Sequence, residues 1–283
     1  MPAMKVHAQG SGMSLPIQIA TSTAIVDEFG RNLQGDALSS TGDLVQILQV
    51  SNGAEIAPPE MDGTPGPGNT VISQGISRIG NLVAPSLTDA GLFSVAIRKN
   101  LSQSNTKLFV RVFNAPSPSE ASFYGDSEAF DIRKSQNVYM VNMAATDKPL
   151  DETDSDSDGV NNSYEKSYGS NANNADSDGD GMMDGAEHYA GTDLMNSSRR
   201  LRIEQGRLSG EHDLAITWQT VSGRCYQLEY TQDDLASAPV FLPVGDPVPA
   251  VADFTTMNVM DGMLYNDRCY RVWVLDPSAN CQP

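Results

Sequence analysis

The sequence predicts a mainly β protein with two β-sandwich domains joined by an acidic segment that carries short helices. Three observations lead to this prediction. The 283 residues exceed the roughly 100–150 of one typical domain. Short β-branched and aromatic runs, typical of strands, fill both ends of the chain. The middle of the chain instead concentrates acidic residues in a pattern that recurs after 22 residues.

The N-terminal part predicts the first sandwich. Residues 1–13 are polar, and we expect them to form a flexible segment. Residues 14–146 then alternate apolar runs with turns such as Met61–Asn69, whose Pro and Gly residues interrupt a strand ladder. The predicted strands are Ile17–Val26, Leu44–Val50, Val71–Ile79, Leu92–Ile97, Leu108–Phe113 and Val138–Val141. We expect an antiparallel sandwich of about seven strands.

The opening strand is unusually long. Apolar residues alternate with small or polar ones from Leu15 to Ile25, roughly 40 Å of extended chain and about twice a typical strand. Two explanations remain open. The strand bends at Ala20–Ser22 and serves both sheets of its own domain, or its Leu15–Ile19 half adds to a sheet edge of a neighbouring copy. Such head-to-tail donation does not close on itself and propagates a filament.

Short strands return in residues 199–283, where we expect the second sandwich. The predicted strands are Leu201–Glu204, Leu214–Trp218, Cys225–Tyr230, Val240–Val244, Phe254–Val259 and Cys269–Val274. Alternate residues of a strand share one face. The faces formed by Tyr226, Leu228 and Tyr230 and by Tyr270, Val272 and Val274 are predicted to make the core.

The charge is strongly acidic and is concentrated in one place. Asp and Glu outnumber Lys and Arg by 36 to 18, a net charge of −18. Residues 147–193 hold 13 of the acids and two Lys, which leaves −7 for the rest of the chain. Nucleic-acid affinity comes from Lys and Arg, so we expect no nucleic-acid partner. No apolar run approaches the roughly 20 residues of a membrane span, so none is predicted.

The acidic segment, residues 147–198, contains the pattern D-x-D-x-D-G-x5-E twice. The pattern is typical of calcium loops, because alternate residues of a tight loop point oxygens at one ion and glycine allows the bend at position 6. Position 7 contributes a backbone carbonyl, and the final glutamate binds with both oxygens. The predicted ligands are Asp154, Asp156, Asp158, Val160, Asn162 and Glu165 in the first loop and Asp176, Asp178, Asp180, Met182, Asp184 and Glu187 in the second. We expect at least two bound Ca²⁺ ions.

Each loop is followed by a short stretch compatible with a helix, Tyr164–Tyr168 and Ala186–Ala190, and a glycine stops each stretch. Pro149 and Asn171–Ala175 leave no room for a helix before either loop, so each unit is a loop plus one helical turn. The alternative is a disordered acidic linker. Random acidity does not place glycine at position 6 and glutamate at position 12 twice in phase, which favours metal binding.

Residues Asp154–Asp193 resemble the thrombospondin type 3 calcium-binding repeats of secreted bacterial proteins. Members of that family usually continue with G-T-D-P after the helix. This chain has Gly-Ser-Asn-Ala at 169–172 and Gly-Thr-Asp-Leu at 191–194, so the resemblance implies additional ligands at Asn171 and Asp193. It also implies a location outside the cell or at the cell surface.

The stretches Ile216–Tyr230 and Cys269–Val274 resemble the fibronectin-III-like domains that follow such repeats in secreted bacterial proteins. In that sandwich the strands that begin at Cys225 and Cys269 are antiparallel neighbours, so their sulfurs lie at opposite ends, beyond the roughly 7 Å Cα limit for a bridge. The resemblance therefore implies a Cys225–Cys281 disulfide with Cys269 unpaired. Three buried free thiols are the alternative.

Nothing in the sequence predicts a catalytic residue. The three histidines, His7, His188 and His212, have no partner at zinc-ligand spacing, and we expect His188 on the exposed face of a repeat helix. Tyr124–Ser127 contains a Gly-Asp-Ser triplet, but it lacks a following apolar helix and an Asp-x-x-His partner. The chain is therefore predicted not to be an enzyme.

Two non-enzymatic functions follow from these features. The first is a secreted structural protein, a calcium-stabilised protomer that self-associates in an extracellular filament, surface layer or adhesin. The second is an accessory module that binds polysaccharide, for which Trp218 and Trp273 are candidate sugar-stacking residues.

Overall fold

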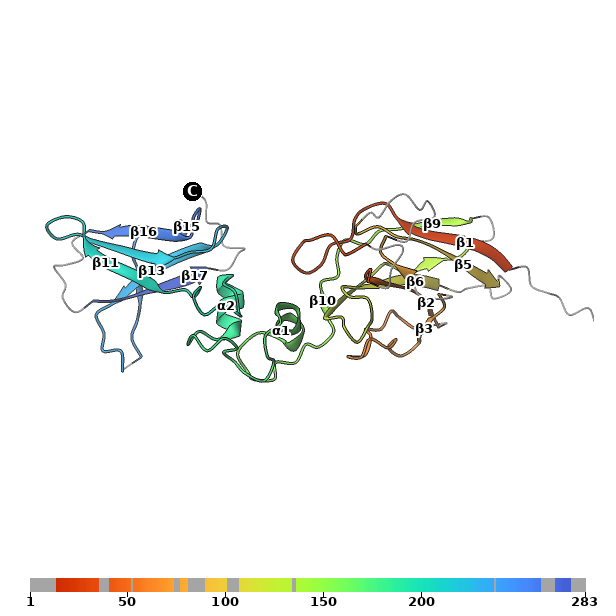
Figure 1. Cartoon of the computed structure of the whole chain (residues 1–283), viewed down its shortest axis with the longest axis horizontal. Coiled ribbons are helices and arrows are strands. Elements are labelled where there is room, and N and C mark those ends of the chain that lie inside the picture. Colours follow the sequence, from red (N-terminus) through yellow and green to blue (C-terminus); the bar gives the residue numbers. More distant parts are fainter. Residues whose placement is uncertain are drawn as a thin grey trace, which may run out of the picture. The chain divides into compact units, whose positions relative to one another are not determined.

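The structure is a computed structural model that describes residues 14–35, 41–51, 53–73, 77–80, 90–100, 107–133, 136–236, 238–260 and 268–275. The N-terminal segment predicted to be flexible, residues 1–13, lies outside this part of the chain. The chain divides into two compact units, residues 1–152 and residues 153–283, which are labelled by element in Figure 1. The mainly β class predicted from the sequence is confirmed.

The described residues of the first unit form two β-sheets. A three-stranded sheet has the order β5-β1-β9, formed by Ser94–Asn100, Ser14–Thr21 and Val138–Val141. The larger sheet has the order β10-β7-β6-β2-β3, formed by Lys148–Pro149, Phe123–Asp126, Lys107–Phe113, Leu44–Val50 and Asn69–Val71. Two short strands also join it, β4 (Ser77–Arg78) beside β2 and β8 (Phe130–Asp131) beside β6.

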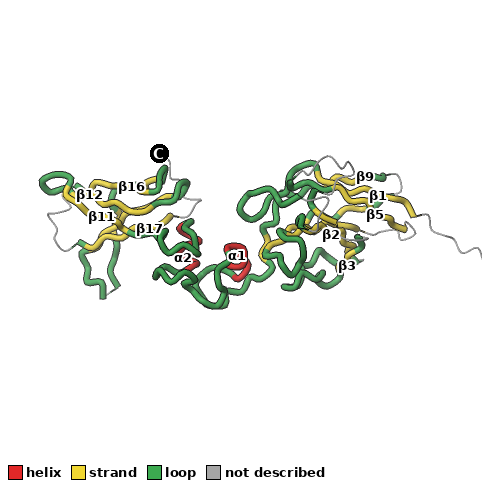
Figure 2. Tube along the Cα trace, viewed as in Figure 1, coloured by secondary structure: helices red, strands yellow, loops and turns green. Residues whose placement is uncertain are grey.

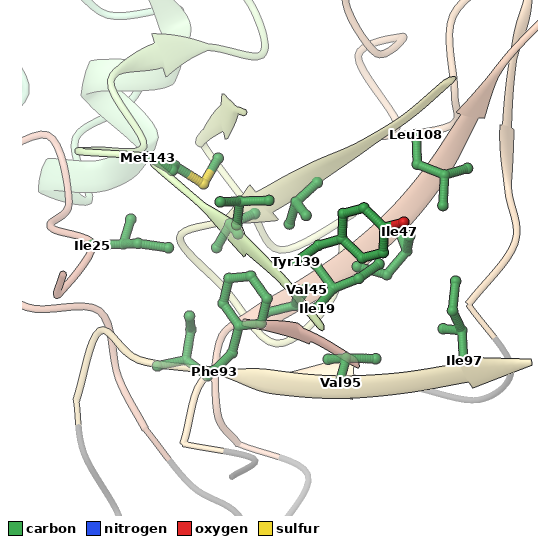
Figure 3. Close-up of a cluster of buried hydrophobic side chains, with 14 of the residues drawn as sticks. Ile19, Ile25, Val45, Ile47, Phe93, Val95, Ile97, Leu108, Tyr139 and Met143 are labelled. Carbon is green, nitrogen blue, oxygen red and sulfur yellow. The ribbon is translucent and has the colours of Figure 1, made fainter. Parts of the chain in front are cut away.

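Apolar side chains from both sheets form the core of the first unit (Figure 3). Ile19 of β1 and Ile47 of β2 are both fully buried, and Val95 of β5 and Leu108 of β6 belong to the same cluster. Alternate residues of each strand face this cluster because side chains of a strand point to opposite faces. The burial of these apolar surfaces is the main favourable term in the folding of the unit.

Strand β1 lies in the middle of its own sheet. It pairs with β5 antiparallel from Ser14 to Ala20 and with β9 parallel from Gln18 to Thr21. The prediction of a wholly antiparallel sandwich is therefore wrong at one pair of strands. A parallel pair needs a long crossover, which the chain between β1 and β9 supplies. The strand also ends at Thr21 rather than Val26. Its pairing with β5 from Ser14 to Ala20 includes the whole Leu15–Ile19 half, which favours a strand retained in its own domain over one donated to a neighbour.

The Gly-Asp-Ser triplet near Tyr124 makes structural contacts. Asp126 accepts two hydrogen bonds from the fully buried Arg111, at 2.7 and 2.9 Å. Ser127 Oγ accepts from the Val110 N–H at 2.9 Å and donates to a neighbouring carbonyl at 3.0 Å. These contacts tie β7 to β6.

In the second unit, the part of the chain that the structure describes forms two antiparallel sheets and two helices. One sheet has the order β11-β12-β16, formed by Ile203–Leu208, Leu214–Gln219 and Phe254–Val259. In the other, β13 (Cys225–Thr231) pairs with β14 (Leu242–Pro243), β15 (Val248–Pro249) and β17 (Cys269–Leu275). Membership of the fibronectin-III class stays a prediction. Among the described helices, none has the length and apolar character to cross a membrane.

Five of the six residues on the predicted faces of β13 and β17 belong to the core of the second unit or pack against it, and the half-buried Tyr230 does not belong to that cluster. Tyr226, Leu228 and Val274 are buried in one cluster around the fully buried Trp218. Ala190 of the second repeat is buried in the same cluster. The second repeat therefore shares a core with the C-terminal β-sheets, a connection that the sequence did not indicate.

The cysteines follow the implied arrangement as far as the structure describes them. Cys225 lies opposite Leu275 and Cys269 lies opposite Thr231, at the two ends of the antiparallel β13–β17 pair. Cys225 is disulfide-bonded and Cys269 is a free thiol. The predicted partner, Cys281, lies outside the described residues.

Candidate metal centre

Two short helices, red in Figure 2, follow the acidic loops. Helix α1 spans Asn162–Tyr168 and helix α2 spans Asp184–Ala190. Each ends at a glycine in the left-handed conformation, Gly169 with φ 83° and Gly191 with φ 78°. The N–H of each glycine donates to a carbonyl of its helix at 2.7 Å, which is the usual helix end that glycine permits. The two predicted helix stops are confirmed.

The first aspartate of each loop organises the backbone around it. Asp154 Oδ1 accepts from the N–H groups of Ser157 and Asp158 at 2.8 and 3.2 Å, and its Oδ2 accepts from Gly159 at 3.0 Å. Asp176 accepts from the corresponding three N–H groups of the second loop at 2.9, 3.2 and 2.9 Å. The two loops therefore have the same local fold.

Glycine at position 6 is required by the backbone conformation. Gly159 has φ 102° and Gly181 has φ 92°, and a Cβ on either residue would meet no atom within 4 Å. The left-handed backbone, not a lack of space, therefore selects glycine. Position 4 differs between the loops, since Ser157 adopts φ 65° where the second loop has Gly179 at φ 75°. The first loop thus places a serine where glycine is favoured.

The predicted aspartates come together in two clusters. Oxygens of Asp154, Asp156 and Asp158 lie within 4.8 Å of one another, and so do those of Asp176, Asp178 and Asp180. Like charges about 4 Å apart repel by roughly 1–4 kcal/mol per pair, depending on the local dielectric. A divalent cation at each cluster would reverse this repulsion.

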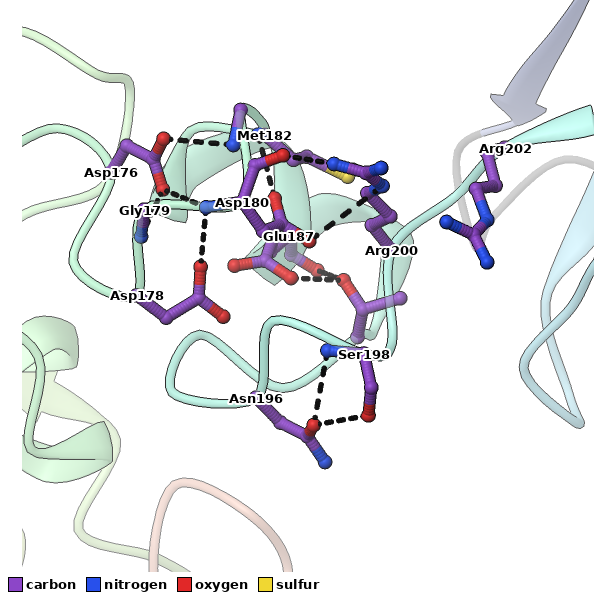
Figure 4. Close-up of polar contacts among 12 residues, drawn as sticks. Asp176, Asp178, Gly179, Asp180, Met182, Glu187, Asn196, Ser198, Arg200 and Arg202 are labelled. Carbon is purple, nitrogen blue, oxygen red and sulfur yellow. Dashed lines mark hydrogen bonds and ion pairs between the residues drawn. The ribbon is translucent and has the colours of Figure 1, made fainter.

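Buried carboxylate oxygens without hydrogen-bond partners are the strongest evidence that the clusters fit a cation. A buried charge normally pairs, forms hydrogen bonds or binds a metal. Such oxygens occur on Asp156, Glu165, Asp178, Asp180, Asp184 and Glu187. Figure 4 shows several of these carboxylates gathered in the second loop. Oxygen-only donor sets of this kind suit Ca²⁺, which takes six to eight oxygen ligands.

The glutamates at position 12 are completely buried. Burial, reinforced by Asp156 and Asp158, raises the pKa of Glu165 to about 7. Burial likewise raises the pKa of Glu187 to about 7, and Asp178 and Asp180 add to the effect although Thr192 donates a hydrogen bond. The ionised form of both carboxylates is therefore destabilised unless a cation compensates its negative charge.

The other predicted ligands divide into two groups. Val160 is 4% exposed and Met182 is partly buried, and both lie at the position whose carbonyl would face the ion. Asn171 and Asp193 lie outside the two aspartate clusters and are exposed. Their Oδ1 atoms accept from backbone N–H groups two residues further on, both at 3.2 Å. Their role as ligands stays a prediction.

His188 is not on an exposed helix face as expected. Its ring centroid lies 4.6 Å from that of Tyr164 and 5.7 Å from that of Tyr168, both on α1. Desolvation, followed by the charge of Arg224, lowers the pKa of His188. His188 therefore packs α2 against α1 and is not a solvent-exposed side chain.

Two further contacts of the loops were not predicted from the sequence. The Gly185 N–H at the start of α2 donates to Asp158 Oδ2 of the first loop at 2.7 Å. A glycine within a helix often has a packing reason. Gly185 could therefore have indicated this close contact from the sequence. Arg200 donates to the Asp180 carbonyl, and its Nε lies 4.0 Å from Asp180 Oδ2 (Figure 4). No feature of the sequence indicated that contact.

Comparison with known proteins identifies one similarity. The family model of the bacterial TSP3 repeat matches residues 154–175 and 176–193. The two matched segments coincide with the two loops and their helices, and the repeat is a structural calcium-binding module. No curated protein and no solved structure matches the chain.

Proposed function

We propose that this chain is a non-enzymatic structural protein whose second unit is stabilised by calcium bound in two loops. The observation that carries the proposal is the set of buried carboxylate oxygens that have no hydrogen-bond partner. Asp154, Asp156, Asp158 and Glu165 would hold one ion and the equivalent residues of the second loop another. Bound Ca²⁺ would supply the positive charge that these oxygens lack.

Calcium binding is expected to stabilise more than the loops. Ala190 of α2 is buried in the core of the C-terminal sheets, and Arg200 contacts Asp180 of the second loop. An ion that orders the second loop therefore stabilises the packing of α2 on those sheets. Ligands that bind only the folded state raise its stability by mass action.

Calorimetry tests the proposal. Isothermal titration should find at least two Ca²⁺ ions, with Kd on the order of 10⁻⁴–10⁻³ M or tighter, the range of extracellular modules. Scanning calorimetry should show that EGTA lowers the Tm of residues 153–283 and leaves the transition of residues 1–152 in place. Glu165→Gln with Glu187→Gln should abolish the calcium response.

A control variant checks that the effect does not come from the loss of negative charge alone. Glu211→Gln removes one negative charge at an exposed position of the same unit, outside both loops. It should leave calcium binding unchanged. A wild-type protein whose heat signal and Tm ignore calcium would refute the proposed function.

We further propose where the protein is located and that it self-associates. Loops of this affinity class are typical of extracellular calcium-binding modules, which favours a secreted protein in a filament, surface layer or adhesive contact. Electron microscopy and light scattering of the purified protein, with calcium and with EGTA, test self-association. A protein that stays monomeric under both conditions at high concentration would exclude the filament.

One observation favours polysaccharide binding as the second candidate. Trp273 on β17 is 53% exposed, whereas Trp218 is fully buried and belongs to the core. The Arg271 guanidinium lies 5.4 Å from the Trp273 ring and 3.7 Å from the Phe241 ring. An exposed tryptophan held beside an arginine suits stacking on a sugar. Glycan-array binding that Trp273→Ala abolishes would favour this function.

A further inference from the structure

We propose that Asp184, at position 9 of the second loop, is a ligand of the calcium ion held by the first loop. The inference rests on the proposed function, since it assigns a residue to a calcium site. It goes beyond that function because it makes the first site depend on the second repeat. The two repeats differ in the partners of the side chain at this position.

Position 9 has the same backbone setting in both repeats. The N–H of Asn162 donates to the carbonyl of Thr153 at 2.8 Å, and the N–H of Asp184 donates to the carbonyl of Ala175 at 2.8 Å. In both repeats Oδ1 accepts from the N–H of the serine at position 2, at 3.2 Å in the first and 2.8 Å in the second. Any difference between the two side chains therefore lies in their second terminal atom.

That second atom has partners in one repeat only. Asn162 Nδ2 donates to Thr153 Oγ1 at 2.8 Å and to Ser155 Oγ at 3.0 Å. Ser155 stands at position 2, whose side chain faces away from the ion because alternate residues face inward. The tip of the position-9 side chain thus lies on the outer side of its own loop. Asp184 Oδ2, at the same place in the second repeat, is buried without a hydrogen-bond partner.

The first loop lies against this part of the second repeat. Gly185, the next residue, donates its N–H to Asp158 Oδ2 at 2.7 Å. A Cβ on Gly185 would come within 2.4 Å of the Asp158 carbonyl oxygen, so the two backbones are in direct contact. The start of α2, where Asp184 lies, therefore packs directly on the first loop.

The ligand count of the first loop has room for such a residue. Three aspartates, one carbonyl and a bidentate glutamate supply six oxygens, and Ca²⁺ accepts up to eight. Position 9 of a calcium loop often acts through water, and here Asn162 is engaged with two hydroxyl groups instead. A carboxylate from the next repeat supplies the missing ligand and adds a negative charge.

The test isolates the first site. Glu187→Gln removes the bidentate ligand of the second loop, and isothermal titration then measures the Ca²⁺ affinity that remains. Adding Asp184→Asn should weaken this remaining affinity by on the order of tenfold, since ligand charge sets affinity in such sites. Asparagine keeps the Oδ1 acceptor for the Ser177 N–H, and the first repeat already carries asparagine at this position, so the fold should be retained.

Two controls make the outcome decisive. Glu211→Gln, made in the Glu187→Gln protein, removes the same charge at an exposed position outside both loops and should leave the remaining affinity unchanged. Circular dichroism and Tm in calcium verify that each variant is folded. An unchanged affinity of the Glu187→Gln protein after Asp184→Asn overturns the shared ligand. Wild-type protein that binds no calcium would instead overturn the proposed function, and the same titration detects it.

Discussion

Gly185→Ala should destabilise the second unit, although glycine-to-alanine changes in helices usually stabilise. Gly185 is the second residue of α2, and alanine there would ordinarily gain about 0.5–1 kcal/mol from helix propensity. The added Cβ, however, would lie 2.4 Å from the Asp158 carbonyl oxygen and 3.1 Å from the Val160 nitrogen. Carbon–oxygen contacts normally measure about 3.3–3.6 Å, so the backbones must separate by about 1 Å.

The size of the effect follows from two losses. Overpacking costs about 1–3 kcal/mol. The 2.7 Å hydrogen bond from the Gly185 N–H to the Asp158 carboxylate is charge-assisted, and its loss costs about 1.5–3 kcal/mol. After the gain in helix propensity we expect a net destabilisation of about 1.5–5.5 kcal/mol. For a unit of this size each kcal/mol lowers Tm by roughly 3–5 °C.

Scanning calorimetry in saturating calcium measures the change. The transition of residues 153–283 is recognised by its response to EGTA, and that of residues 1–152 serves as an internal reference. Gly206→Ala is the matched control, because its Cβ would meet only the flexible end of Leu214 at 3.7 Å. If Gly185→Ala raises Tm, or shifts it no more than Gly206→Ala does, the two repeats are not packed as described.

Three further predictions test other parts of the molecule. Ser157→Gly should stabilise the calcium-bound second unit by about 0.5–1 kcal/mol in denaturant titrations, because it relieves a left-handed serine at φ 65°; a loss of stability would contradict this. Arg111→Ala should destabilise the first unit by about 3–5 kcal/mol, because the buried Asp126 carboxylate loses both hydrogen bonds from Arg111 and retains the half-exposed Lys148 ammonium, 3.7 Å from its Oδ2, as an ion-pair partner, and urea unfolding checks the value. Burial raises the pKa of Asp43 from 3.8 to about 6, so its contribution to stability is fully present below pH 3.8 and is lost as pH rises through 6. Asp43→Asn should therefore gain stability relative to wild type between pH 4 and pH 7, and a difference independent of pH in urea unfolding would exclude the effect.

The cysteine arrangement shows how far a predicted topology reaches. The sulfurs of Cys225 and Cys269 were expected at opposite ends of neighbouring antiparallel strands, and the register of β13 and β17 places them there. The free thiol of Cys269 agrees with this expectation. The prediction held because strand direction follows from short connections and alternation of apolar residues. The strand bounds were less reliable, since β14 covers only Leu242–Pro243 of the predicted Val240–Val244.

The sequence by itself determined the features that depend on nearby residues. The spacing of Asp154, Asp156 and Asp158, the glycine at 159 and the stop at Gly169 all act within one loop and its helix, where geometry links positions directly. The apolar runs of the strands are local in the same sense.

Only the tertiary structure decided which of these pieces touch. The packing of Gly185 on Asp158, the burial of Ala190 among the C-terminal sheets and the parallel pairing of β1 with β9 join residues far apart in the chain. Such contacts depend on shape and burial across the whole unit, and no short pattern specifies them. For the same reason the sequence predicted the loop ligands as two sets of six, one for each loop, and only the contact between the repeats pointed to the buried oxygen of Asp184 as a ligand of the first loop.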